Sequence, residues 1–82
     1  MNIYELEVRA VCPVVDGEID VYQARIESQS TIEVEKILAF FDKHKTEKIF
    51  QEDLTRKAAV TIGAKVQTVG VHSNVKVTCT FP

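Results

Sequence analysis

Residues 3–28 read IYELEVRAVCPVVDGEIDVYQARIES, two alternating runs separated by a turn. In residues 3–12 apolar and charged side chains alternate, which is the period of a half-buried strand. Residues 18–28 alternate in the same way, and residues 13–17 (PVVDG) carry the proline and the Asp-Gly pair of a turn. The stretch therefore predicts an antiparallel hairpin with one apolar face.

Helical spacing follows this hairpin. Ser30 and Glu33 have the spacing of a capping box, in which each side chain bonds the backbone N–H of the other residue. Apolar residues then recur at helical spacing as far as Asp42 or Lys43. We expect a first helix that begins at Ser30.

A second helix is expected after the polar linker of residues 44–47. Phe50, Leu54 and Ala58 would share one face of this helix. Gly63 is placed to end it, because glycine adopts the left-handed conformation at little cost.

The last segment alternates again and predicts a second hairpin, with strands at residues 64–72 and 74–81. The side chains expected to face inward from its second strand are Val75, Val77, Cys79 and Phe81. The order strand, strand, helix, helix, strand, strand predicts one α+β domain over residues 1–82. Its two helices would cover one face of a four-stranded antiparallel sheet.

The opposite face of this sheet is expected to be polar on every strand. The residues assigned to it are Glu5, Glu7, Arg9, Gln23, Arg25, Glu27, Lys65, Gln67, Lys76 and Thr78. Open edges in so small a sheet favour pairing with neighbouring copies. Closure of such pairs into a barrel would line a water-filled lumen with the polar face.

Length and composition narrow the class of protein. A chain of 82 residues buries a marginal core, which favours support from partner subunits. The net charge of −2 argues against broad phosphate-driven binding to nucleic acid. Cys12 and Cys79 are too few for a disulfide framework, no leader-like segment opens the chain, and its most apolar stretch is too short to span a bilayer. We expect a cytoplasmic protein.

Two motifs resemble known families. Residues 12–26, CPVVDGEIDVYQARI, resemble the CP–x–TGQPDFATV–x–I segment of the QueF family, the 7-cyano-7-deazaguanine reductases. Residues 49–64, IFQEDLTRKAAVTIGA, are similar to that family's FHED segment and to the QE–x–LT segment of GTP cyclohydrolases. The expected topology resembles their shared tunnelling fold, which implies a homo-oligomeric ring or two stacked rings.

The resemblance implies roles for four residues. Cys12 falls on the nucleophilic cysteine, and Asp20 falls near the general acid, with one extra residue between the two. Glu52 falls on the glutamate that anchors the heterocycle, and Glu33 lies where a second pocket glutamate is expected. The residues themselves leave simpler interpretations open: Cys12 as a buried small hydrophobe, Glu33 as a helix cap and Glu52 as a solvated helical residue.

The resemblance also implies a reaction. A thiolate at Cys12 would attack the nitrile carbon of 7-cyano-7-deazaguanine and form a thioimide, while Asp20 supplies a proton to the nitrogen. QueF reductases carry ESKSLKLY for the nicotinamide cofactor, where this chain reads EVEKILAF at residues 33–40. The chain is more similar to the short archaeal QueF-like proteins, which lack that motif and form the amidine of archaeosine in tRNA. We therefore expect an amidine-forming enzyme, with no cofactor assigned and the substrate either a free base or a base in tRNA.

Three alternatives remain at this point. An NADPH-dependent reductase of the queuosine pathway would use the same Cys12. A pterin or GTP cyclohydrolase-like enzyme would share Glu52 and need no Cys-Pro nucleophile. A non-catalytic purine-binding ring would hold Cys12 in its core. No metal is expected, because Cys12, His72 and Cys79 match no compact zinc motif.

Overall fold

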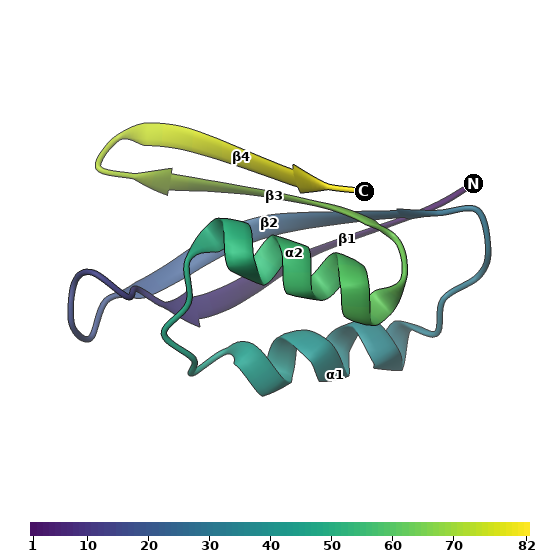
Figure 1. Cartoon of the computed structure of the whole chain (residues 1–82), viewed down its shortest axis with the longest axis horizontal. Coiled ribbons are helices and arrows are strands. Elements are labelled where there is room, and N and C mark those ends of the chain that lie inside the picture. The colour runs from purple at the N-terminus through teal and green to yellow at the C-terminus, as the bar shows by residue number, and fades with distance from the viewer.

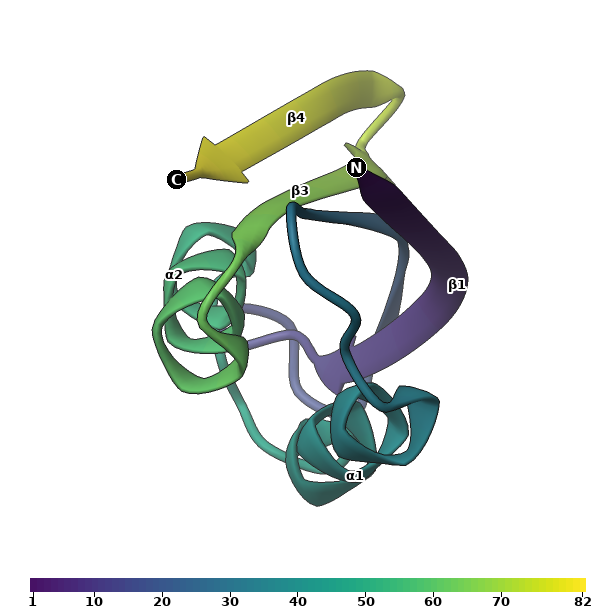
Figure 2. The ribbon, with the colours of Figure 1, turned by 90° about the vertical axis from the view of Figure 1, so that its right-hand side faces the viewer.

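The computed structural model describes residues 1–82 and confirms the expected order of elements. The four strands form one antiparallel sheet in the order β1-β2-β3-β4, with α1 and α2 on one face (Figure 1). The elements are β1 (Asn2–Val11), β2 (Ile19–Ser28), α1 (Val34–His44), α2 (Gln51–Ile62), β3 (Lys65–His72) and β4 (Val75–Phe81). Figure 2 shows the sheet curving around the helices, and β1 and β4 are its open edges.

The register of the sheet determines which side chains meet the helices. β1 pairs with β2 from Asn2 opposite Ser28 to Val11 opposite Ile19, so the first hairpin is confirmed over its whole length. Alternation then directs Tyr22, Ala24 and other apolar β2 residues toward the helices, as predicted. These side chains join one core cluster of 15 buried residues, to which α1 contributes Ile37, Phe40 and Phe41 and α2 contributes Leu54, Ala58, Ala59 and Ile62.

Helix α1 begins at Val34, later than the predicted start at Ser30. Glu33 is its N-cap residue with an extended backbone (φ −64°, ψ 127°), and no side-chain hydrogen bond caps the helix. The predicted capping box between Ser30 and Glu33 is therefore wrong.

One local and one tertiary hydrogen bond hold the segment that precedes α1. The backbone N–H of Ser30 donates to the hydroxyl of Ser28, at 3.2 Å. The N–H of Ile32 donates to the hydroxyl of Tyr4 on β1, at 2.9 Å. The bond from Ile32 to Tyr4 and the burial of Ile32 in the core anchor the segment before Glu33 to β1.

Helix α2 ends where the sequence predicts. Gly63 is left-handed (φ 78°, ψ 41°), and its N–H donates to the carbonyl of Ala59 at 2.9 Å. Leu54 and Ala58 are fully buried. The prediction that Phe50 packs beside them is wrong, because Phe50 has an extended backbone at the N-cap and is 52% exposed.

The second hairpin turns through Ser73 and Asn74, which both have positive φ, at 50° and 66°. This two-residue loop is the tight connection that suits twisted strands. Cys79 and two other predicted inward residues of β4 are half-buried, but Val75 is 61% exposed. Val75 follows the turn on an edge strand, where a neighbouring strand covers only one side of it.

The outer face of the sheet is mixed rather than polar throughout. Register places Glu5, Arg25 and Gln67 side by side on this face, as expected. Toward the β2 start the same face carries Val21 and Val71, which are 41% and 67% exposed. Neither α1 nor α2 combines the length and apolar character that crossing a membrane requires.

Candidate functional site

A cleft of about 520 Å³ opens where β1 and β3 end, β2 and β4 begin, and α2 starts. Cys12, Asp20 and Glu52 all line it. The fold therefore brings together three of the four residues that the sequence nominates.

The connection between the two helices brings Cys12 to α2. Val11, the last residue of β1, makes a parallel bridge with Lys48. Its N–H donates to the carbonyl of Glu47 at 3.0 Å, and its carbonyl accepts from Ile49 at 3.2 Å. The residue before Cys12 is thus tied to the segment that leads into α2.

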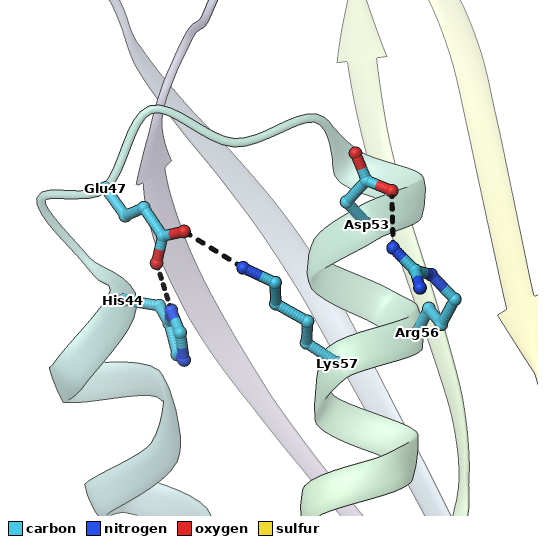
Figure 3. A network of polar contacts seen from close by, with 5 residues as sticks. All are labelled: His44, Glu47, Asp53, Arg56 and Lys57. Atoms are coloured by element: carbon cyan, nitrogen blue, oxygen red, sulfur yellow. Dashed lines mark hydrogen bonds and ion pairs between the residues drawn. The ribbon is translucent and has the colours of Figure 1, made fainter.

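A polar cluster fastens this connection to α2 (Figure 3). His44 at the end of α1 bonds one carboxylate oxygen of Glu47, and Lys57 on α2 donates to the other at 3.2 Å. The hydrogen bond from His44, followed by that from Lys57, lowers the pKa of Glu47. Glu47 is therefore held as a carboxylate that joins α1, the connection and α2.

The two cysteines in the cleft have different surroundings. The backbone N–H of Val15 donates to the sulfur of Cys12, at 3.3 Å. Burial, and then the charge of Glu52, raises the pKa of the Cys79 thiol. This favours the protonated form of Cys79, which is a weaker nucleophile than a thiolate.

Asp20 is 7% exposed, on the inward phase of β2. The Tyr22 hydroxyl donates to its Oδ2 at 3.2 Å, and His72 Nδ1 lies 3.9 Å from its Oδ1. Burial and then the charge of Asp20 raise the pKa of Tyr22, so the phenol remains protonated as a donor. The buried carboxyl group of Asp20 therefore has the hydrogen-bond partner that burial requires, which is the Tyr22 hydroxyl.

Gln51 completes the wall of the cleft and was not nominated from the sequence. Its Nε2 donates to the carbonyls of Thr68 and Val77, at 3.1 Å and 3.0 Å, and its Oε1 lies 3.0 Å from His72 Nε2. The available indications were that Gln51 directly precedes Glu52 in the quoted motif and that His72 continues the inward phase of β3.

Comparison with known proteins bears on this arrangement. No protein-family model matches the chain, and no curated protein is similar to it in sequence. One solved structure that it resembles is the crystal structure of the archaeosine synthase QueF-Like in the apo form. The TM-score is 0.80 with 16% identity, over 98% of this chain and 89% of that chain.

The two proteins share a fold. The α+β tunnelling fold predicted from the sequence is thereby confirmed, together with the resemblance to QueF-like proteins at the level of structure.

Gly70 allows Tyr22 to reach Asp20 within this fold. A Cβ at Gly70 would lie 2.5 Å from Tyr22 Cδ1 and 2.7 Å from Cε1. Only glycine lets the tyrosine ring rest on the β3 backbone in this way. Gly70 thereby contributes to the orientation of the Tyr22 hydroxyl.

Glu33 does not line the cleft. It is exposed at the start of α1, where the neighbouring Lys36 donates to the carbonyl of Ile62 at the end of α2, at 3.5 Å. Glu52 lies at the beginning of α2, whereas Glu33 lies near the end of α2. Within one chain the two glutamates are therefore far apart.

A second hollow, of about 510 Å³, lies between α1 and β1. Its lining includes Leu6, Leu38 and Phe41 but no cysteine or histidine, so it offers no thiol or imidazole. No three His, Cys, Asp or Glu side chains of the chain form a group suited to a metal ion.

Proposed function

We propose that this chain is an enzyme that captures the nitrile of a 7-cyano-7-deazaguanine base on Cys12 and converts it to an amidine. The observation that carries the proposal is the cleft in which Cys12, Asp20 and Glu52 meet. The shared fold with an archaeosine synthase QueF-Like supports it. In this proposal the base is free or part of a tRNA, and the reaction is cytoplasmic.

The first step is addition to the nitrile. The Cys12 thiolate forms a C–S bond with the nitrile carbon, and one C–N π pair moves to nitrogen. Protonated Asp20 gives its proton to that nitrogen and becomes a carboxylate. The product is a neutral thioimide in which the N–H of Val15 no longer faces a charged sulfur.

The second step releases the enzyme. Ammonia forms a C–N bond to the thioimide carbon, and the C–S bond breaks to return the Cys12 thiolate. The base then carries a protonated amidine, whose positive charge balances that of the returned thiolate. Hydride transfer is not included, because Glu35 and Leu38 stand where the reductase motif has its two lysines.

Glu52 recognises the heterocycle in this proposal. The N1–H and the 2-amino group of a guanine-like edge are two parallel donors, and a carboxylate accepts both. Glu52 is exposed on the first turn of α2 and has no protein hydrogen bond, which leaves both of its oxygens for a ligand. A contribution from Glu33 would come from a neighbouring copy, brought in across an open sheet edge.

Intact-protein mass spectrometry tests the proposal directly. After incubation with 7-cyano-7-deazaguanine, we expect an adduct of the full ligand mass that maps to Cys12. Cys12→Ala should abolish this adduct, and the matched control Cys79→Ala should retain it. Addition of ammonium should then release the base as its amidine.

Three other results would contradict the proposed function. A protein that binds the base without forming the adduct would be a non-catalytic purine-binding ring. Release only with NADPH would identify a reductase. An adduct that maps to Cys79 would contradict the assignment of the nucleophile.

A further inference from the structure

The cleft contains a single group able to carry a positive charge. Its lining has the acidic or thiol side chains of Cys12, Glu18, Asp20, Glu52 and Cys79, together with the Tyr22 phenol. No lysine or arginine lines it, which leaves the imidazole of His72. The other histidine, His44, is engaged with Glu47. Any positive charge that balances the cleft from within therefore resides on His72.

The orientation of the Gln51 amide is determined by its neighbours. Its Nε2 lies 3.1 Å from the carbonyl oxygen of Thr68 and 3.0 Å from that of Val77. Both oxygens accept hydrogen bonds and neither donates, so the NH₂ group must face them. The amide oxygen is thereby directed at His72 Nε2, 3.0 Å away.

This orientation determines where His72 carries its hydrogen. The amide oxygen of Gln51 only accepts, so His72 Nε2 must donate and is protonated in both charge states of the ring. Proton exchange therefore occurs at Nδ1. That nitrogen lies 3.9 Å from Asp20 Oδ1, the carboxyl oxygen that Tyr22 does not bond.

We propose that His72 is a positioning residue that returns to Asp20 the proton given to the substrate. The inference rests on the proposed function. When Asp20 protonates the nitrile nitrogen, it becomes a carboxylate facing Nδ1–H of the imidazolium. The proton then crosses to Oδ1 through a small rotation or one bridging water, and His72 takes a new proton from solvent. Its side chain is 36% exposed, which gives it that access.

The informative variant is His72→Gln. A glutamine amide N–H can replace the Nε2–H donor to Gln51, but it has no group that titrates near neutral pH. We expect noncovalent binding of guanine to stay within about twofold of wild type, because the Glu52 carboxylate is unchanged. We expect the rate of amidine formation over repeated turnovers, measured with 7-cyano-7-deazaguanine and ammonium, to fall about 10- to 100-fold.

The pH profile separates proton return from a merely structural role. The ratio of wild-type to H72Q rates of amidine formation over repeated turnovers should rise as pH falls from about 8 to about 6, the range in which imidazole gains its proton. A ratio that stays constant with pH would overturn the inference. Equal rates for the two proteins at every pH would also overturn it.

A second measurement does not depend on turnover. Long-range ¹H–¹⁵N correlation of the His72 ring in the wild-type protein should show the Nε2–H tautomer when the ring is neutral. Observation of Nδ1–H would overturn the geometry. If the wild-type protein binds the base but never captures it, the proposed function fails, and the tautomer measurement still decides whether Gln51 directs Nδ1 toward Asp20.

Discussion

The two ends of the inner face of the sheet are built differently. At one end Ile26 of β2 lies opposite Val66 of β3, and both are fully buried beside Ile62. At the other end the same two strands carry Asp20 and His72, which line a cleft. A single strand thus supplies apolar core at one end and chemistry at the other.

The difference follows from what each end requires. Apolar side chains are stabilised by leaving water, so the Ile26 end needs only good packing. A buried polar group needs a partner, so Asp20 at the cleft end depends on Tyr22. Stability from the apolar end therefore permits a polar site at the other, and each end should respond to a different kind of substitution.

The largest expected effect is at the cleft. Glu52→Gln should weaken binding of guanine by about 10²- to 10³-fold, because a neutral amide loses two charge-assisted hydrogen bonds of about 1.5–3 kcal/mol each. Folding stability should change little, since Glu52 is exposed. Isothermal titration measures the affinity. The neighbouring Asp53→Asn is the matched control, and equal losses in both variants would contradict ring recognition by Glu52.

At the apolar end, Ile26→Ala should lower the free energy of unfolding by about 2–4 kcal/mol, because it leaves a cavity in the core. Ile26→Val should cost about 1 kcal/mol and serves as the graded control. Urea unfolding measures both. A loss below about 1 kcal/mol for the alanine variant would show that this end does not dominate stability.

A smaller effect is expected at Gly70, which lies on β3 between Val66 of the apolar end and His72 of the cleft. Gly70→Ala should lower the free energy of unfolding by about 1–3 kcal/mol, because the new methyl group displaces the Tyr22 ring. The rate of Cys12 adduct formation should fall with it, since Tyr22 holds Asp20. In a Tyr22→Leu background the cost of Gly70→Ala should shrink. If Gly70→Ala lowers the free energy of unfolding equally in the wild-type and Tyr22→Leu backgrounds, the Tyr22 ring is not the group that the methyl displaces.

The smallest effect concerns the cluster that fastens the helix connection. The folded state lowers the pKa of Glu47, so its contribution to stability is present above the ordinary glutamate value and is lost as pH falls through the lowered one. Glu47→Gln should therefore lower the melting temperature at pH about 7, and the difference from wild type should shrink as pH falls below the ordinary glutamate pKa of about 4.3. Asp42→Asn, in an exposed pair with Lys45, is the control. If the difference in melting temperature between Glu47→Gln and wild type stays the same in acid, the charge of Glu47 is not what stabilises the cluster.

The sequence was most informative where structure is local. Alternation predicted both hairpins, and Gly63 was correctly assigned to the end of α2. The start of α1 was missed because the hydroxyl of Tyr4 engages Ile32 from a distant part of the chain. Phe50 was misassigned because helical spacing does not reveal that its backbone is still extended.

The candidate site shows the same limit. The quoted motifs nominated Cys12, Asp20 and Glu52, which the cleft brings together, and Glu33, which it does not. His72 was not recognised, because its importance depends on the strand register that sets it beside Asp20.

Periodicity alone was enough to specify the strands, the helices and the apolar face, because neighbouring residues share one backbone geometry. Only the folded chain decided that the end of β1 bridges to the segment before α2 and that Gln51 orients His72. Such contacts join residues far apart in sequence, and their geometry follows from register and packing rather than from any repeating pattern.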